Sequence, residues 1–362
     1  MIMMGRIIPL WDRKRPGGDM ALEKIVQLHR KFAPDLIHTM EDRYNILRNI
    51  RYNEPIGRRA LAGILGIGER AVRVQVDFLK EAGMVEFSLM GMRVTPEGEA
   101  SLQDIGEYVR LLHGFSSLEQ ELSQKLGIKR VIVIPGDSDT EPMVQRELGR
   151  VAAGVLAEYL KDHMTIAVSG GSTMAMIAEG VYVKQPTTTV VAARGGLGEK
   201  MEYQANTIAA RMAAKLGGSY RLLHVPEVVS EQVAEAILTS DSNLPAVAQM
   251  IKKADILVHS IGRAEKMALR RGLDKQTVQE ILRRGAVGET LGHYCTLEGK
   301  PVYVTNSVGL RLEDLSGVGT VIAVAGGRDK AEAIVAVVRA GRQDVLVLDE
   351  AAALAIRDLC RC

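Results

Sequence analysis

The stretch "TIAVSGGSTMAMIAEG", Thr165 to Gly180, decides the fold of the larger part of this chain. An apolar run, Thr165–Val168, leads into "SGGST", and a segment with helical character follows at once. A strand that ends in a glycine loop and continues as a helix is the building unit of a parallel α/β sheet. The same unit often binds anions, because backbone N–H groups at the start of the helix point toward the loop.

Further apolar, β-branched segments follow from Lys129 onward, and segments with helical periodicity separate most of them. Strands that are apolar on both faces are typical of a mainly parallel sheet with helices on both sides. Right-handed crossovers place the carboxyl ends of such strands along one edge, where ligands bind. The sequence therefore predicts a doubly wound α/β domain. Its expected strands are "VIVIPG", "TIAVSGG", "TTTVVAARGG", "SYRLLHVP", "DILVHSIG", "PVYVTN", "TVIAVAGG" and "DVLVLDE".

Glycine-rich loops follow four of these expected strands. Glycine lets backbone N–H groups approach an anion, and the next helix N-terminus adds a favourable dipole. One such loop is equally well explained by a tight turn, but several at one edge favour phosphate binding. Neither a P-loop signature nor a strict dinucleotide fingerprint occurs, so no nucleotide cofactor is expected. The contributing residues are Gly170, Gly171, Ser172 and Thr173; Arg194, Gly195 and Gly196; His259–Gly262; and Arg328 and Lys330.

Two separated cationic loops suit a ligand with a phosphate at each end. Between them, "GAVGETLGHYC" contains Glu289, which is either an acceptor for sugar hydroxyls or a solvated loop carboxylate. "KMALRRG" adds Arg270 and Arg271, of which one is expected to face the ligand. No partner at useful spacing makes Glu289 or His259 a general base, which favours a binding site over an enzyme's active site.

Residues 41–99 have a different character, with three short helical segments. Gly66 to Gly68 forms a tight connection between the second and third segments, as in a helix-turn-helix. Gly83 ends the third segment, and 84–89 and 92–95 then form a hairpin around "MG". This order predicts a winged helix. The apolar stripes of the three helices are Tyr44, Leu47 and Ile50; Leu61, Ile64 and Leu65; and Val72, Val76 and Leu79.

The third helix of a winged helix enters the DNA major groove with the face opposite its buried stripe. Between Arg43 and Lys80 there are eight basic and three acidic residues, a local excess that can hold phosphates. A solvated charged face would give the same count, but the order of helices and hairpin favours DNA. The expected DNA-binding residues are Arg58, Arg59, Glu69, Arg70, Arg73 and Val74.

The length of 362 residues exceeds what one core usually holds, so two domains are expected. With 47% hydrophobic residues, 25% charged residues and a net charge of +2, the chain is typical of soluble globular proteins. No apolar run is long enough to span a bilayer, and the N-terminus lacks the order of a signal peptide. Three cysteines without zinc spacing indicate a reducing, cytoplasmic location; Cys360 and Cys362 are expected in a frayed terminus and not at a metal.

The expected organisation is a disordered extension over 1–22, the winged helix over 23–100, a linker helix over 101–127 and the α/β domain over 128–362. Leucines at helical spacing give the linker an apolar seam, which either packs on the next domain or forms a dimer contact.

Several segments together resemble one family. "EPIGRRALAGILGIGERAVRVQVDFLKEAGMV" resembles the DNA-binding domain of a glycolytic regulator within the SorC family of sugar-responsive transcription factors. "VSGGSTMAMIAE", "ARGGLGE", "HSIGRAEKMALRRG", "AVGETLGHY", "SVGLRLEDL" and "AVAGGRDKAEAI" resemble successive parts of its effector domain. The likeness covers about Glu23 to Arg339, and the family's effector domain is similar to glucosamine-6-phosphate deaminase and ribose-5-phosphate isomerase.

The resemblance implies a repressor of a glycolytic operon that responds to fructose-1,6-bisphosphate and binds other glycolytic phosphosugars to a lesser extent. It places one phosphate on the loop from Gly170 to Thr173, with Arg194, Gly195 and Gly196 adjacent. Arg270, Glu289 and Lys330 fall where groups for the second phosphate and the sugar belong. The alternative is a sugar-phosphate isomerase or deaminase with a fused DNA-binding module. A winged helix reads one half-site, so a dimer or tetramer on operator DNA is expected.

Overall fold

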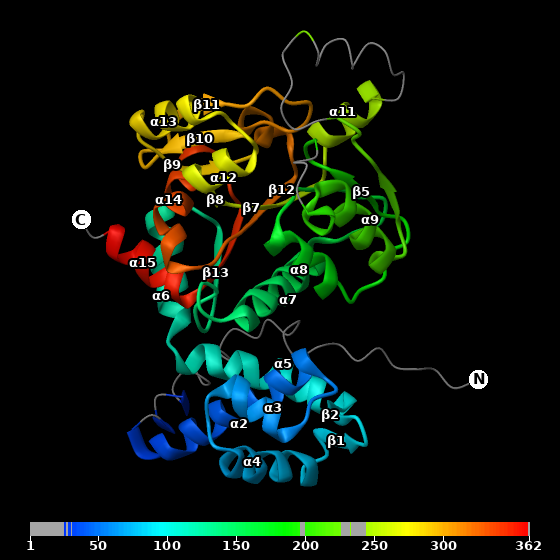
Figure 1. Cartoon of the computed structure of the whole chain (residues 1–362), viewed down its shortest axis with the longest axis vertical. Helices are drawn as coiled ribbons and strands as arrows, with labels where there is room; N and C mark the ends of the chain where they lie inside the picture. Colours follow the sequence, from blue (N-terminus) through cyan, green and yellow to red (C-terminus); the bar gives the residue numbers. More distant parts are fainter. Residues whose placement is uncertain are drawn as a thin grey trace. The chain divides into compact units, whose positions relative to one another are not determined.

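The computed structural model describes residues 25–26, 28–29, 31–195, 200–225, 232 and 244–360. The chain divides into two compact units, Met1–Phe115 and Ser116–Cys362 (Figure 1). The expected extension over 1–22, Gly196 and Cys362 lie outside the described residues.

The N-terminal unit is a helix-turn-helix followed by a β-hairpin. Its turn is made by Gly66, which has a φ of 65°, in the left-handed region that glycine adopts without strain. The hairpin pairs Val85 with Val94 and Ser88 with Gly91 in antiparallel register. The predicted winged helix is therefore confirmed. Its elements are α2 (Pro34–Asn53), α3 (Arg58–Leu65), α4 (Glu69–Glu81), β1 (Val85–Ser88), β2 (Gly91–Val94) and α5 (Pro96–Leu112).

The core of this unit contains the predicted stripes of α2 and α4 but only part of that of α3. Leu61 and Ala62 are buried in α3, whereas Ile64 is 53% exposed. Ile64 comes two residues after Ala62, about 200° further round the helix, so it faces away. The prediction that Ile64 is a core residue was wrong.

The C-terminal unit is built on a seven-stranded sheet in which every pair of neighbours is parallel. The predicted doubly wound α/β domain is confirmed. In spatial order the strands are β3 (Arg130–Ile134), β13 (Val345–Asp349), β12 (Thr320–Val324), β7 (Ile256–Ser260), β4 (Thr165–Val168), β5 (Thr189–Ala192) and β6 (Ser219–Arg221).

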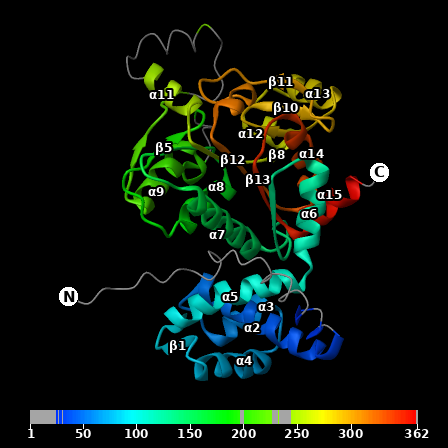
Figure 2. The ribbon, with the colours of Figure 1, turned by 180° about the vertical axis from the view of Figure 1, so that it is seen from behind.

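Successive strand residues pack into two separate cores on opposite faces of this sheet. Ile166 and Val168 lie in one core with residues of α7 (Pro142–Tyr159), α8 (Ser172–Gly180) and α9 (Ala205–Leu216). Ala167 lies in the other core with residues of α11 (Leu244–Lys252) and α14 (Ala331–Ala340). The period of two along a strand explains the division, and the layers can be followed from both sides in Figures 1 and 2.

A second, four-stranded antiparallel sheet carries part of the site. The segment "PVYVTN", predicted as a strand of the parallel sheet, belongs here instead, because a short apolar run does not reveal which sheet it joins. Helices α12 (Ala264–Arg270) and α13 (Lys275–Arg283) share a small core with this sheet. Its strands are β8 (Gly262–Arg263), β9 (Ala286–Thr290), β10 (His293–Thr296) and β11 (Pro301–Val304).

The remaining elements are helical. Residues 101–127 fold as parts of two helices, α5 and α6 (Phe115–Leu126), with Gly114 at a φ of 69° between them. Three 3₁₀ turns and α15 (Glu350–Leu359) complete the described elements; the turns are η2 (Met201–Tyr203), η3 (Leu312–Gly317) and η4 (Arg328–Lys330). In the part of the chain that the structure describes, no helix is long and apolar enough to cross a membrane.

Candidate functional site

A cavity of about 330 Å³ opens at the carboxyl ends of the parallel strands. It is lined by the loops after β3, β4, β5, β7 and β12 and by residues of α12 and β9. The structure thus brings the predicted glycine loops together around one space. The predicted effector residues that line it are Gly170, Gly171, Ser172, Thr173, Arg194, Gly195, Arg270, Glu289 and Lys330; Arg328 is not among its lining residues.

The loop after β4 is held tightly against η2. A Cβ at Gly170 would lie 2.8 Å from the carbonyl oxygen of Tyr203, and the N–H of Gly171 donates to that same oxygen at 2.8 Å. The N–H of Gly171 therefore binds the protein and is not available to an anion, contrary to the simple idea that every glycine N–H faces the ligand. The available donors come from the first turn of α8, where helix N–H groups have no intrahelical acceptor.

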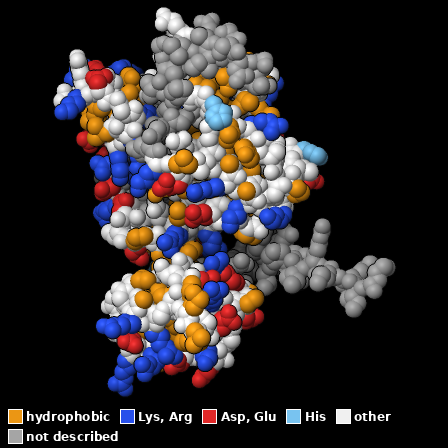
Figure 3. All heavy atoms as spheres, turned by 45° about the vertical axis from the view of Figure 1, so that its right-hand side comes forward, with side chains coloured by type: hydrophobic (Ala, Val, Ile, Leu, Met, Phe, Trp, Pro, Cys, Tyr) orange, Lys and Arg blue, Asp and Glu red, His pale blue; other side chains and the backbone are white. Residues whose placement is uncertain are grey.

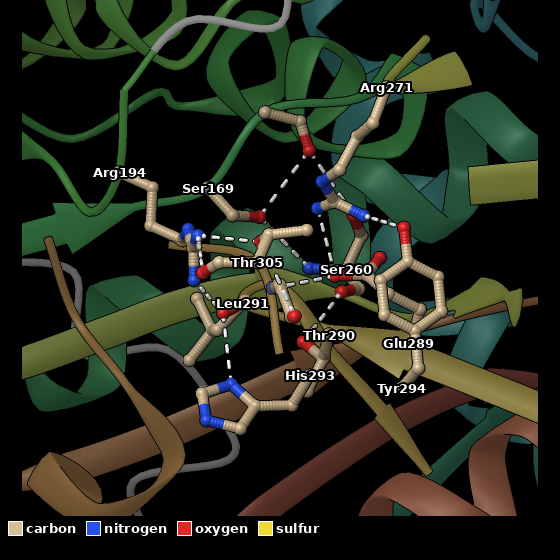
Figure 4. Close-up of polar contacts among 12 residues, drawn as sticks. Ser169, Arg194, Ser260, Arg271, Glu289, Thr290, Leu291, His293, Tyr294 and Thr305 are labelled. Carbon is tan, nitrogen blue, oxygen red and sulfur yellow. Dashed lines mark hydrogen bonds and ion pairs between the residues drawn. The ribbon is translucent and has the colours of Figure 1, made fainter. Parts of the chain in front are cut away.

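Arg194 is buried and its guanidinium binds backbone carbonyl groups. It donates to the carbonyl oxygen of Leu291 and, at 3.1 Å, to the hydroxyl of Thr305 (Figure 4). Gly292 makes room for it, because a Cβ there would lie 2.5 Å from both terminal nitrogens of the guanidinium. Carbonyl dipoles do not cancel a formal charge, so Arg194 still contributes positive potential to the cavity.

Glu289 and Arg271 form a buried ion pair at the floor of the cavity. Arg271 Nη2 lies 2.8 Å from Glu289 Oε1, and both side chains are less than 5% exposed. Arg271 also donates to the hydroxyl of Tyr294 at 3.1 Å, and Glu289 accepts the N–H of Gly292 at 2.7 Å (Figure 4). Glu289 lies on β9 and not on a loop, so its interpretation as a solvated loop carboxylate was wrong.

Strand β9 approaches helix α14 closely beside this ion pair. A Cβ at Gly288 would lie 2.6 Å from the carbonyl oxygen of Ala333, so only glycine fits there. Glu289 is the next residue of the strand, so this close packing fixes its position.

Three cationic side chains, Lys266, Arg270 and Lys330, line another part of the cavity. The pKa of Lys330 is lowered chiefly by burial, and the neighbouring charges of Lys266 and Arg270 lower it further, whereas Asp139 and Asp349 raise it. An anion placed beside these three side chains would relieve their mutual repulsion and favour the charged form of Lys330. Sequence reasoning missed Lys266, although Arg263, Lys266 and Arg270 follow the three-to-four-residue spacing of one helix face.

A buried carboxylate, Asp349, holds the loops around Lys330 in place. It accepts backbone N–H groups of Ser138 at 2.8 Å, Gly327 at 2.7 Å and Ala352 at 2.9 Å. Gly327 has a φ of 97°, and a Cβ there would overlap the carboxylate of Asp139. The two loops that flank Lys330 are therefore fixed by one side chain.

Asp349→Ala is expected to destabilise the protein by roughly 3 kcal/mol, because three backbone N–H groups lose a buried acceptor. Urea unfolding measures this, with the exposed Glu332→Ala as a matched carboxylate control that leaves stability within about 0.5 kcal/mol. An unchanged midpoint for Asp349→Ala would show that water replaces the carboxylate.

His259, the other group considered as a base, is completely buried away from the cavity lining. Its ring nitrogens lie 2.9 Å from Thr290 Oγ1 and 2.8 Å from Gln343 Oε1. Burial lowers the pKa of His259, which keeps the ring neutral at physiological pH. His259 therefore ties β7 to its neighbours. Within the described residues, no group of three or more His, Cys, Asp or Glu side chains is arranged to hold a metal ion.

On the N-terminal unit, α4 presents most of the predicted DNA-binding residues to solvent. Glu69, Arg70, Arg73 and Val74 are all exposed, and Arg73 is only loosely paired with Glu69 at 4.0 Å. Figure 3 shows Lys and Arg side chains gathered on part of the surface of this unit.

Arg59 is also exposed, whereas Arg58 is engaged within the unit. The guanidinium of Arg58 lies 2.6 Å from Asp77 Oδ1 and 4.8 Å from the ring centroid of Phe87. Arg58 therefore connects α3 to α4 and to the hairpin.

Comparison with known proteins agrees with both units. A model described as "CggR N-terminal DNA binding domain" matches residues 39–109, and one described as "Putative sugar-binding domain" matches residues 112–357. Fold and site together define a transcriptional regulator that carries a DNA-binding domain followed by a sugar-binding domain.

The relatives specify the family. The chain is 40% identical to the central glycolytic genes regulator of Bacillus subtilis over 92% of its own length and 98% of the relative's. It is 39% identical to the regulator of the same name from Priestia megaterium, with the same coverage. The chain belongs to the family of central glycolytic genes regulators, which are transcriptional regulators and not enzymes.

Solved structures show the same architecture. A "putative SorC family transcriptional regulator" from Enterococcus faecalis is 41% identical, covers 67% of this chain and 99% of that one, and superposes with a TM-score of 0.62. The full-length sorbitol operon regulator SorC from Klebsiella pneumoniae covers 93% of this chain and 98% of its own, with a TM-score of 0.62 and 18% identity, which supports the fold alone.

Proposed function

We propose that this protein is a cytoplasmic repressor of a glycolytic operon whose operator binding is modulated by fructose-1,6-bisphosphate. The observation that carries the proposal is the pairing of two anion-attracting regions in one cavity: the first turn of α8 and the cluster of Lys266, Arg270 and Lys330. The names of the two relatives from Bacillus subtilis and Priestia megaterium, regulators of central glycolytic genes, support the operon class.

The charge of the cavity favours a bisphosphate over a single phosphate. Among the described residues that line the cavity, seven are cationic and three are acidic, an excess of four positive charges. Each phosphate monoester carries about 1.5 to 2 negative charges near neutral pH, so two phosphates balance this excess and one does not. The acidic residues are Asp139, Glu289 and Asp329, and the cations are Arg194, Lys200, Arg263, Lys266, Arg270, Arg271 and Lys330.

The sugar would lie between the two phosphates. The buried Arg271–Glu289 pair at the cavity floor offers carboxylate acceptors and guanidinium donors to hydroxyl groups. The exposed face of α4, with Arg70, Arg73 and Val74, would contact operator DNA. A dimer or tetramer would place several such helices on a long operator.

Effector and DNA binding must be coupled if the sugar phosphate is to control transcription. Coupling free energies are reciprocal, so an effector that weakens operator binding is itself bound more weakly by the DNA complex. Residues 101–127, which fold as parts of α5 and α6 and include the boundary between the two units at Phe115 and Ser116, are the proposed transmitter.

A thermal-shift titration of the full chain tests the effector assignment. A ligand that binds only the folded state raises the melting temperature according to its affinity and concentration. Fructose-1,6-bisphosphate is expected to give a larger shift than fructose-6-phosphate, and inorganic phosphate the smallest. Equal shifts from all three at equal concentration would contradict a two-phosphate site, and no shift from any of them would reject the effector class.

A further inference from the structure

The serine hydroxyl groups near the start of α8 differ in whether they donate or accept a hydrogen bond within the protein. A serine hydroxyl has one proton to donate and two lone pairs that accept. Ser169 and Ser260 both donate to the carbonyl oxygen of Gly170, at 3.3 Å and 3.2 Å (Figure 4). Each has therefore used its proton within the protein, and neither can donate to a ligand without breaking that bond.

Ser172 has the opposite arrangement. The amide Nε2 of Gln145 donates to Ser172 Oγ at 3.2 Å, so the serine oxygen accepts and retains its own proton. Both residues line the cavity, and Ser172 is the first residue of α8. Its hydroxyl proton and the helix dipole then favour an anion at the same place.

The packing of α7 on α8 fixes this contact. A Cβ at Gly149 of α7 would lie 2.6 Å from the backbone of Met176, and one at Gly180 would lie 3.0 Å from Cα of Arg150. The two helices therefore approach backbone to backbone, with Gln145 in the first turn of α7 opposite the start of α8. The backbone of Gln145 is therefore held at a fixed distance from the start of α8, within reach of Ser172 Oγ.

We propose that Gln145 is a positioning residue of the effector site, which fills a lone pair of Ser172 and thereby directs the hydroxyl proton of Ser172 to a phosphate oxygen. The inference rests on the proposed function, since it names a residue through which the phosphate site works. No local sequence pattern selects Gln145, because it lies on α7, the helix after β3, and outside every glycine loop.

A double-mutant cycle on the full chain tests the proposal, with calorimetric titration of fructose-1,6-bisphosphate. Gln145→Met keeps the length of the side chain and removes the donor, and Ser172→Ala removes the hydroxyl. Each is expected to weaken binding about tenfold, the usual effect of one hydrogen bond to a charged group. In the Ser172→Ala background, Gln145→Met should cause no further loss, because its target is absent.

Two further variants separate positioning from a structural role. Gln145→Glu presents an acceptor that captures the Ser172 proton, so it is expected to weaken binding more than Gln145→Met. The melting temperature of the unliganded protein should be the same for the Gln145→Met and wild-type chains. Gln279→Met, at an exposed position of α13 away from the cavity, is the matched control and should bind like the wild type.

The outcomes are distinguishable. The role of Gln145 would be overturned if Gln145→Met bound the bisphosphate as the wild type does. It would also be overturned if the affinity losses of the two single variants multiplied in the double variant. Either result would leave the proposed function intact. A wild-type chain that binds no sugar bisphosphate would overturn the proposed function and this inference with it.

Discussion

Lys330→Met is expected to weaken binding of fructose-1,6-bisphosphate about 100-fold, because loss of a partly buried charge-assisted contact costs about 2 to 3 kcal/mol. Burial lowers the pKa of Lys330 in spite of the opposing charges of Asp139 and Asp349, so its charged form is disfavoured within the folded protein. The same substitution should therefore leave the unliganded protein at least as stable as the wild type, while operator binding persists and no longer responds to the sugar phosphate. Calorimetry and thermal unfolding measure the two effects.

Lys275→Met is the control for this variant, since Lys275 is exposed at the start of α13 and does not line the cavity. It should bind the bisphosphate as the wild type does. If Lys330→Met keeps full affinity, the cationic part of the cavity does not hold a phosphate. If the variant loses affinity and also unfolds at a lower temperature, Lys330 has a structural role that its surroundings do not indicate.

The variant Arg70→Ala with Arg73→Ala is expected to reduce operator affinity about 100-fold or more, since each arginine that contacts DNA contributes about 1 to 3 kcal/mol. Both side chains extend from the exposed face of α4, whereas Val72, Val76 and Leu79 anchor its other face. Fluorescence anisotropy with operator DNA selected from a random pool measures the loss. Affinity for the sugar bisphosphate should not change.

Arg284→Ala, an exposed arginine in the C-terminal unit, is the matched control and should bind operator normally. The salt dependence gives a second measurement, because each lost phosphate contact reduces the slope of log affinity against log salt by about 0.9. An unaltered operator affinity in the double arginine variant would exclude this face of α4 as the DNA-binding surface.

The sequence predicted the features of the fold that depend on local pattern. Apolar β-branched runs identified all seven strands of the parallel sheet. The right-handed crossover rule predicted that their glycine loops lie at one edge of the sheet, and these loops line one cavity in the structure. The winged helix followed from three amphipathic segments and a hairpin. Ile64 and the strand at Pro301–Val304 were misplaced, because a short apolar segment does not reveal which neighbour covers it.

The chemistry of the site was less accessible from sequence. Glycine spacing located Gly171 but not the carbonyl oxygen of Tyr203 that takes up its N–H. Adjacent arginines at 270 and 271 look alike in sequence, yet Arg271 forms the buried pair with Glu289 while Arg270 lies with Lys266 and Lys330. The direction of a hydrogen bond, as between Gln145 and Ser172, depends on contacts between distant helices, which no local pattern encodes.

Operator binding as a function of fructose-1,6-bisphosphate concentration tests the central proposal most directly. The full chain is titrated onto a selected operator fragment at fixed salt, with fructose-6-phosphate and inorganic phosphate in parallel. We predict that the bisphosphate weakens operator binding and that Lys330→Met abolishes this response without abolishing binding. Operator affinity that stays constant across all three ligands would contradict a sugar-bisphosphate-controlled repressor.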